Sequence, residues 1–297
     1  MTGLWSLIKR NSKMFFKDKA MFFTSLITPI ILLVLYATFL AKVYKDAFSG
    51  SFPPGFQIDE KLINGAVGGQ LVSSLLAVSC VTVAFCSNLL MVQDKISGAR
   101  RDLTMTPVKS YTLSLSYFIS CAAVTLIISV TALGAGLIYL AATGWYLSLT
   151  DILLLLVDVI LLVLFGTSLS SVISCNLSTN GQSSAVGTIV SAGYGFICGA
   201  YMPISSFGDG LQKVISFLPG TYGTSLLRNH TLRGVFAEMK DKGYPTEVID
   251  GLRDAVDCNI YFFDNKVSEP VMFIILGISA VLVTAAYVII CKLRKTK

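Results

Sequence analysis

The chain has 297 residues, of which 54% are hydrophobic and 13% are charged, and its mean hydropathy is +0.73. Soluble globular proteins carry about 25% charged residues, so much of this surface does not face water. The formal net charge of +6 is small for a nucleic-acid-binding protein, and the basic residues lie beside apolar segments rather than in one patch. These values argue against a soluble protein and a nucleic-acid partner, and they favour one membrane domain over residues 1–297.

Residues 1–19 contain an amphipathic pattern. One predicted helical face carries apolar side chains, namely Leu4, Leu7, Ile8, Met14 and Phe15. The opposite face carries basic side chains, namely Lys9, Arg10, Lys13 and Lys17. This pattern is typical of a helix that lies in the membrane interface. A soluble helix packed on another domain is the alternative, but the direct junction to an apolar segment favours the interfacial helix.

Six apolar segments follow, each near the roughly 20 residues that a helix needs to cross a bilayer. They are 20–41, 67–92, 111–142, 152–175, 183–204 and 270–291. The first begins near residue 20 and has full spanning length, which argues against a cleavable signal peptide. We therefore expect an all-α integral membrane fold with an N-terminal interfacial helix and six transmembrane helices.

The distribution of Lys and Arg predicts the orientation of these helices. Thirteen lie in the N-terminal segment, in the loop after the second span and at the C-terminus, against three in the short loops on the other side. Basic residues in short loops mark the cytoplasmic side. We expect a multi-pass protein of the cell membrane with both termini cytoplasmic. Outside, the loop 42–66 is expected to be irregular around Pro53-Pro54-Gly55, the connection 143–151 is a short turn, and 205–269 is the one sizeable segment.

No catalytic or metal-binding arrangement is evident in the sequence. The single histidine, His230, lies in the predicted external segment, where a packing or surface role is the usual one. The seven cysteines include no CxxC pair, which argues against a zinc site and a disulfide framework. The chain also lacks the G-x-x-x-x-G-K-[ST] phosphate-binding loop. We expect no enzyme activity and no cofactor in this chain.

The predicted cytoplasmic loop 93–110 is the most informative stretch. It contains a charged pair, a glycine, a short charged helical turn and a proline before the next span. This arrangement resembles that of the type-2 ABC exporter permeases, in which a short amphipathic coupling helix occupies this loop. The matching residues are Asp94, Lys95, Gly98, Arg101, Asp102, Leu103, Thr106 and Pro107. Many members carry a glutamate just before the charged turn, where this chain has Gln93 or Asp94.

A second resemblance to the same family covers residues 195–206 and 218–222. There the pattern G-x-x-x-P-h-S precedes an external re-entrant helical segment and a proline-tyrosine turn. The resemblance implies two permease halves, identical or homologous, around a pathway in the membrane lipid. It also implies two copies of a partner ATPase that bind ATP and Mg and dock beneath them.

Two further features stand out inside the predicted spans. Small residues recur every four positions in the fifth span and end at a proline: Ser183, Gly187, Ser191, Gly195, Gly199 and Pro203. Such a stripe permits close helix approach, either within the chain or at a dimer or pathway interface. Asp158 is the one acid well inside a span, so it is expected to face the protein interior or water. Its partner is left open between a hydroxyl, a water and a base of the external segment.

The sequence therefore predicts a permease that exports a drug, peptide or lipid-like substrate. A polysaccharide or lipid-linked glycan permease shares this architecture and is the nearest alternative. A secondary transporter without ATP is the alternative from another class. It predicts internal repeats and several intramembrane charges, whereas the sequence shows no clear repeat and one deep acid.

Overall fold

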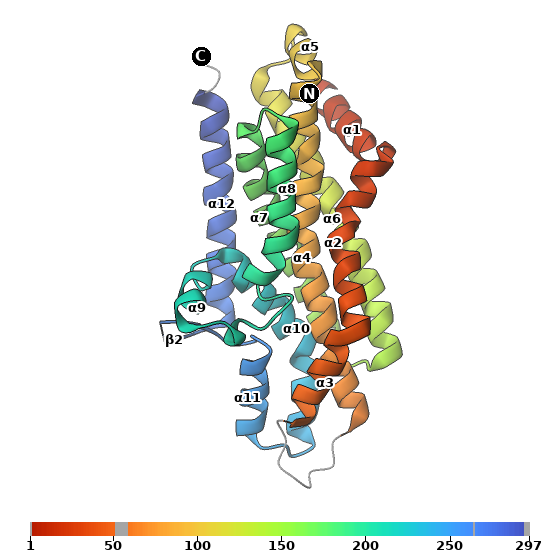
Figure 1. The fold of residues 1–297 in the computed structure, drawn as a ribbon, viewed down its shortest axis with the longest axis vertical. Helices are drawn as coiled ribbons and strands as arrows, with labels where there is room; N and C mark the ends of the chain where they lie inside the picture. Colours follow the sequence, from red (N-terminus) through yellow and green to blue (C-terminus); the bar gives the residue numbers. More distant parts are fainter. Residues whose placement is uncertain (1, 51–58, 264, 294–297) are drawn as a thin grey trace.

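The computed structural model describes residues 2–50, 59–263 and 265–293. Long helices run side by side and form an elongated bundle, with short helices at its two ends (Figure 1). The first helices are α1 (Thr2–Lys17), α2 (Lys19–Leu35), a π-helical turn η1 (Tyr36–Leu40), α3 (Ala41–Gly50), α4 (Glu60–Ile96), α5 (Ala99–Met105) and α6 (Ser110–Thr143). The remaining elements are α7 (Leu149–Asn176), α8 (Asn180–Ile197), a 3-10 turn η2 (Ile204–Ser206), α9 (Asp209–Ile215), α10 (Pro219–Asp241), α11 (Thr246–Ala255), β1 (Ile260–Phe262), β2 (Asn265–Val267) and α12 (Glu269–Leu293).

Helix α4 is the central element of the bundle. It has 37 residues, and 94% of its most apolar window is buried. It packs against α2, α6, α7, α8 and α10. Gly166 of α7 lets the backbones approach closely, because a Cβ there would lie 2.8 Å from the carbonyl oxygen of Cys80 in α4.

Among the residues that the structure describes, five helices are long and apolar enough to cross a membrane. They cover Lys19–Asp46, Glu60–Ile96, Ser110–Thr143, Leu149–Asn176 and Glu269–Leu293. The outer helices expose large apolar side chains, such as Ile274, Ile278 and Val281 of α12, and only 17% of the α12 window is buried. A surface of this kind is stable in lipid rather than in water. The chain is a multi-pass membrane protein.

The fifth predicted span, 183–204, is shorter than expected. Its helix, α8, has 18 residues and ends at Ile197. Polar residues such as Asn180 and Gln182 lie in its first turn, and α8 is not one of the five long apolar helices. It ends because Gly199 adopts a left-handed φ of 75° and the N–H of Tyr201 turns back to the carbonyl of Gly195.

The predicted irregular loop 42–66 is largely helical. Helix α3 continues from η1 to Gly50, and α4 begins at Glu60, seven residues before the predicted span. Asp59 caps α4 by accepting a hydrogen bond from the N–H of Lys61 at 2.9 Å. Pro53-Pro54-Gly55 lies outside the described residues.

The predicted external segment 205–269 is mostly a folded part of the bundle. Helix α10 packs against α4, α7 and α12, and many of its side chains are buried. Strands β1 and β2 form an antiparallel hairpin that the sequence analysis did not predict, with Ile260 paired to Val267. This segment supplies about half of the buried side chains in the core cluster that joins η1, α3, the start of α4, α10 and α11, at the end of the bundle opposite α5 (Figure 1).

Candidate functional site

Helix α5 forms the tip at one end of the bundle, where α1 and the end of α12 also lie (Figure 1). Gly98 precedes it with φ 83°, a left-handed conformation that reverses the chain after α4. The hydroxyl of Thr106 closes the other end by donating to the carbonyl of Leu103 at 2.6 Å. Among its seven residues none is buried. The sequence-predicted coupling loop is therefore a short, defined helix that projects from the bundle.

Three of the eight predicted coupling residues, Arg101, Asp102 and Leu103, lie on α5, and Thr106 and Pro107 directly follow it. Arg101, Asp102, Thr106 and Pro107 are exposed. Leu103 is half-buried and packs on the cluster that joins α1, α4 and α6. This arrangement presents charged and polar groups outward on a helix that one apolar side chain anchors.

Asp94 and Lys95 face inward instead. Arg10 of α1 forms a two-pronged ion pair with the Asp94 carboxylate, with Nη2 to Oδ1 at 3.0 Å, and the hydroxyl of Tyr117 in α6 donates to the same carboxylate. The ammonium of Lys95 donates to the carbonyls of Cys175 and Leu177 at 2.6 and 2.9 Å. A cation at a helix C-terminus stabilises it. These two side chains connect the last turn of α4 to α1, α6 and α7.

The small-residue stripe divides into two parts. Ser183, Gly187 and Ser191 are half-buried, and a Cβ on Gly187 would meet no atom of this chain within 4 Å. Gly195 is packed within the chain, because a Cβ there would lie 2.3 Å from the ring of Tyr201. The last two residues of the stripe, Gly199 and Pro203, lie in the turn that follows α8.

Asp158 lies in the interior and is paired with the single histidine. Both side chains are 1% exposed, and Asp158 Oδ2 lies 2.5 Å from Nδ1 of His230 in α10. Nε2 of His230 lies 4.0 Å from Oε2 of Glu269, at the start of α12. The partner of Asp158 is thus a base of the predicted external segment, one of the three options that the sequence left open.

Sequence reasoning missed a second buried network, around Arg228 of α10. Its side chain is fully buried, and its Nη1 lies 2.8 Å from Oδ2 of Asp257. The guanidinium also donates to the hydroxyl of Ser74 in α4 and to the carbonyl of Gly199, while Asp257 accepts the N–H of Ile204 at 2.9 Å. This network fixes the turn after α8 to α4 and α10.

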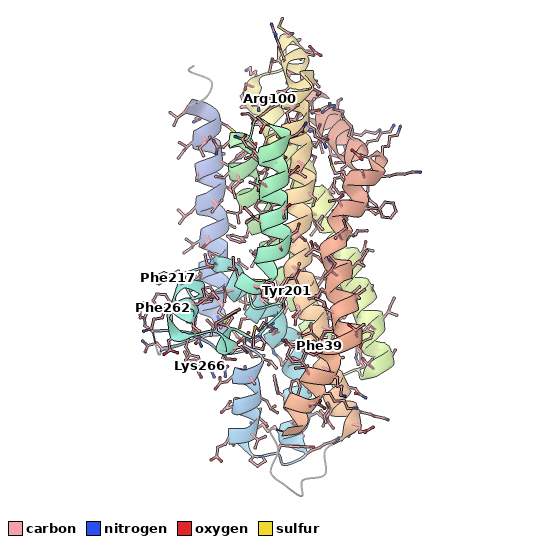
Figure 2. The ribbon with its side chains drawn as sticks, in the orientation of Figure 1. Phe39, Arg100, Tyr201, Phe217, Phe262 and Lys266 are labelled. Carbon is pink, nitrogen blue, oxygen red and sulfur yellow. The ribbon has the colours of Figure 1, made fainter. Side chains whose placement is uncertain are left out.

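Opposite α5, the bundle also has an exposed ion pair and an apolar groove. Lys242 lies 2.6 Å from Asp59, and this neighbour lowers the pKa of the Asp59 carboxyl and raises that of Lys242. The groove has a volume of about 430 Å³ and lies between η1, α3, α11 and the turn after α8. Phe39 and Tyr201, which Figure 2 labels, line it together with Phe48, Phe196 and Met202.

A metal centre is not suggested by the described residues. Across residues 2–50, 59–263 and 265–293, no group of three or more His, Cys, Asp or Glu side chains is placed to hold a metal ion. The polar groups that do converge, around Asp158 and Arg228, are His–carboxylate and Arg–carboxylate pairs.

Comparison with known proteins agrees with this architecture. The family model described as ABC-2 type transporter matches residues 2–231, from α1 into α10. A search of curated proteins finds no match to the chain. The family match covers well over half of the sequence. The chain therefore belongs to the ABC-2 type transporter family, as a membrane permease domain that lacks ATPase motifs and relies on a partner subunit for ATP hydrolysis.

Proposed function

We propose that this chain is one permease half of an ATP-driven exporter that moves a drug, peptide or lipid-like substrate out of the cytoplasm or the inner leaflet. It pairs with a second permease, identical or homologous. Two ATPase subunits, which bind ATP and Mg, dock on the α5 end. The first part of the small-residue stripe, Ser183, Gly187 and Ser191, faces the second permease or the pathway, and α8 provides the sixth crossing.

The observation that carries this proposal is the exposed helix α5 at a basic end of the bundle. The elements at that end, α1, the start of α2, the loop around α5 and the last turn of α12, hold few acids: Asp18, Asp94 and Asp102. They hold many bases: Lys9, Arg10, Lys13, Lys17, Lys19, Lys95, Arg100, Arg101, Lys109 and Lys292. The short connections at the opposite end hold three bases, Lys42, Lys45 and Lys61, so the distribution of bases in short loops supports a cytoplasmic position for the α5 end. A projecting helix on that side is accessible to a cytoplasmic ATPase.

The contacts made by the last turn of α4, which leads into α5, suggest how docking would move the permease. Asp94 and Lys95 lie in the last turn of α4 and tie it to α1, α6 and α7. A displacement of α5 is therefore transmitted directly to the buried central helix. We propose that ATP binding draws the ATPases together and shifts the two permease halves between two states through this connection.

The groove beside η1 and α11 supports a lipid-like substrate. Its lining is mostly aromatic and aliphatic, with few polar groups, among them the hydroxyls of Tyr44, Tyr201 and Ser206. An apolar chain gains free energy by leaving water for such a surface, whereas a glycan leaves its hydroxyls without partners. The aromatic lining is also the one observation that favours the second candidate, a permease for a lipid-linked glycan.

Mutation of α5 tests the proposed coupling. We expect Asp102→Lys and Pro107→Ala to reduce ATP hydrolysis by the reconstituted complex about tenfold, because the first reverses a charge on the docking face and the second removes the fixed exit from α5. Asp241→Lys, an equivalent change on an exposed residue at the other end, is the control. Membrane insertion is checked separately. Normal hydrolysis in both α5 variants would show that this loop serves topology alone.

A further inference from the structure

The pair formed by Asp158 and His230 is buried in a way that leaves one polar atom without a partner. Asp158 Oδ2 contacts Nδ1 of His230 at 2.5 Å, while Asp158 Oδ1 is buried and makes no hydrogen bond. An ionised carboxylate beside a neutral imidazole would therefore place one uncompensated negative charge among apolar side chains. Such a charge is costly, and one additional proton on the pair removes it.

The elements that pack around this pair carry several titratable and charged groups. Helix α7 contributes Asp151, which lies 3.3 Å from Arg233 of α10. Glu269 of α12 lies between Arg233 at 3.3 Å and Arg253 of α11 at 3.8 Å. Helix α4 contributes the neutral thiol of Cys80, buried in the same core as the α7 and α10 side chains. The two arginines are therefore paired with carboxylates, and within the described part of the chain the one cation in contact with Asp158 is a protonated His230.

Glu269 provides a connection from this pair to solvent. Its side chain is 36% exposed, and it lines an open pocket of about 320 Å³ together with Arg233, Asp250 and Arg253. Its Oε2 lies 4.0 Å from Nε2 of His230. This distance exceeds a hydrogen bond, so proton transfer needs a rotation of Glu269 or one bridging water. The three side chains of Glu269, His230 and Asp158 thus form a path that leads from the surface into the bundle.

We propose that Asp158 and His230 form a proton-binding site that is reached through Glu269 from the end of the bundle opposite α5. The Glu269 carboxyl gives a proton to Nε2 of His230, and the Nδ1 proton is then shared with or passed to Oδ2 of Asp158. The bound proton neutralises the interface between α7 and α10. The assignment of this end to the outside of the cell rests on the proposed function, whereas the site itself does not.

The chain contains a single histidine, so one labelling experiment reports on this site alone. The full chain, labelled with ¹⁵N-histidine and reconstituted in phosphatidylcholine vesicles, is measured by solid-state NMR between pH 5 and pH 9. We expect Nε2 to be protonated at low pH and unprotonated at high pH. The protonated pair can exist as a carboxylate with an imidazolium or as a carboxylic acid with a neutral imidazole. Nε2 carries a proton in both forms and loses it when the pair loses its proton. An Nε2 signal that does not change across this range would overturn the proposal.

Two variants separate the site from its access route. Asp158→Asn removes the buried negative charge, so we expect the Nε2 transition to move down by at least about one pH unit. An unchanged transition would mean that the pair does not share the proton. Glu269→Gln is expected to slow the response of Nε2 to a pH jump on the α10–α11 side at least tenfold. Glu238→Gln, a change on an exposed side chain away from the pair, is the control and is expected to leave the rate of this response unchanged.

The side of the membrane from which the proton reaches the pair is measured in vesicles. The orientation of the chain in these vesicles is determined by labelling the Lys266→Cys variant. A response only to pH on the α5 side would overturn access through Glu269. The other possible result is a normal response to pH on the α10–α11 side, combined with labelling that places this end in the cytoplasm of cells. That result would support the proton site and contradict the proposed function.

Discussion

At the scale of single residues, the turn after α8 depends on two glycines with different roles. Gly195 leaves room for the ring of Tyr201, and Gly199 adopts the left-handed conformation that ends the helix. Gly199 also brings its carbonyl to the buried guanidinium of Arg228. The spacing of these glycines suggested helix contact, whereas the structure uses both inside the chain. A four-residue repeat of small side chains cannot by itself distinguish the two.

Substitution of Gly199 is expected to destabilise the protein strongly. In Gly199→Ala the new Cβ would lie 2.9 Å from Ile204 and 3.1 Å from Asp257, at a φ that alanine rarely adopts. The backbone strain alone costs about 1–3 kcal/mol. Gly193→Ala is the matched control, because its Cβ meets nothing within 4 Å in a helix. The measurement is the thermal unfolding temperature in detergent, and equal temperatures for the two variants would contradict this account of the turn.

At the scale of elements, α8 has less packing against its own chain than the other long helices. Although α8 lies alongside α4, Gly195 is the only buried residue of α8. The exposed positions near its start are polar or small, including Ser184, Ala185 and Thr188. This surface supports the proposal that a second permease covers α8.

Gly187→Leu tests that proposal directly. Because no atom of this chain lies near a Cβ at Gly187, the larger side chain has space in the single chain and would clash only with a partner. We expect it to reduce crosslinking between two permease subunits at least fivefold, at matched expression. Thr188→Leu, an exposed neighbour about 100° around the helix, is the control. If both variants crosslink like the unmodified chain, the stripe has no interface role.

The long apolar helices could be predicted from the sequence, whereas the burial of α10 inside the bundle could not. Five predicted spans correspond to helices within a few residues at most ends, because about 20 consecutive apolar residues are a strong signal. Helix α10 contains Arg228, Asn229 and His230 in adjacent positions, which reads as a surface segment. Arg228 and His230 are buried because Asp257 and Asp158, 29 and 72 residues away, pair with them, and the amide of Asn229 donates to the carbonyl of Cys258. A pattern within one segment does not contain such partners.

At the scale of the whole molecule, the two ends of the bundle differ in chemistry. The α5 end carries many bases, few acids and one short projecting helix, while the opposite end carries the apolar groove and the buried Asp–His and Arg–Asp pairs. Helix α4 spans both ends (Figure 1). A permease that is driven from one side and binds or releases substrate at the other needs this separation. In the assembly that we propose, the partner ATPase contacts the α5 end.

Site-specific crosslinking measures this contact most directly. Met105→Cys places a thiol on α5 at a side chain that is 80% exposed, and Lys266→Cys places one on the exposed hairpin at the other end. The partially exposed native Cys291 is replaced by Ser in both. With a bifunctional thiol reagent in the assembled complex, the account predicts a crosslink from Met105→Cys to the ATPase and none from Lys266→Cys. A crosslink from Lys266→Cys, or an intact complex in which Met105→Cys gives none, would contradict it.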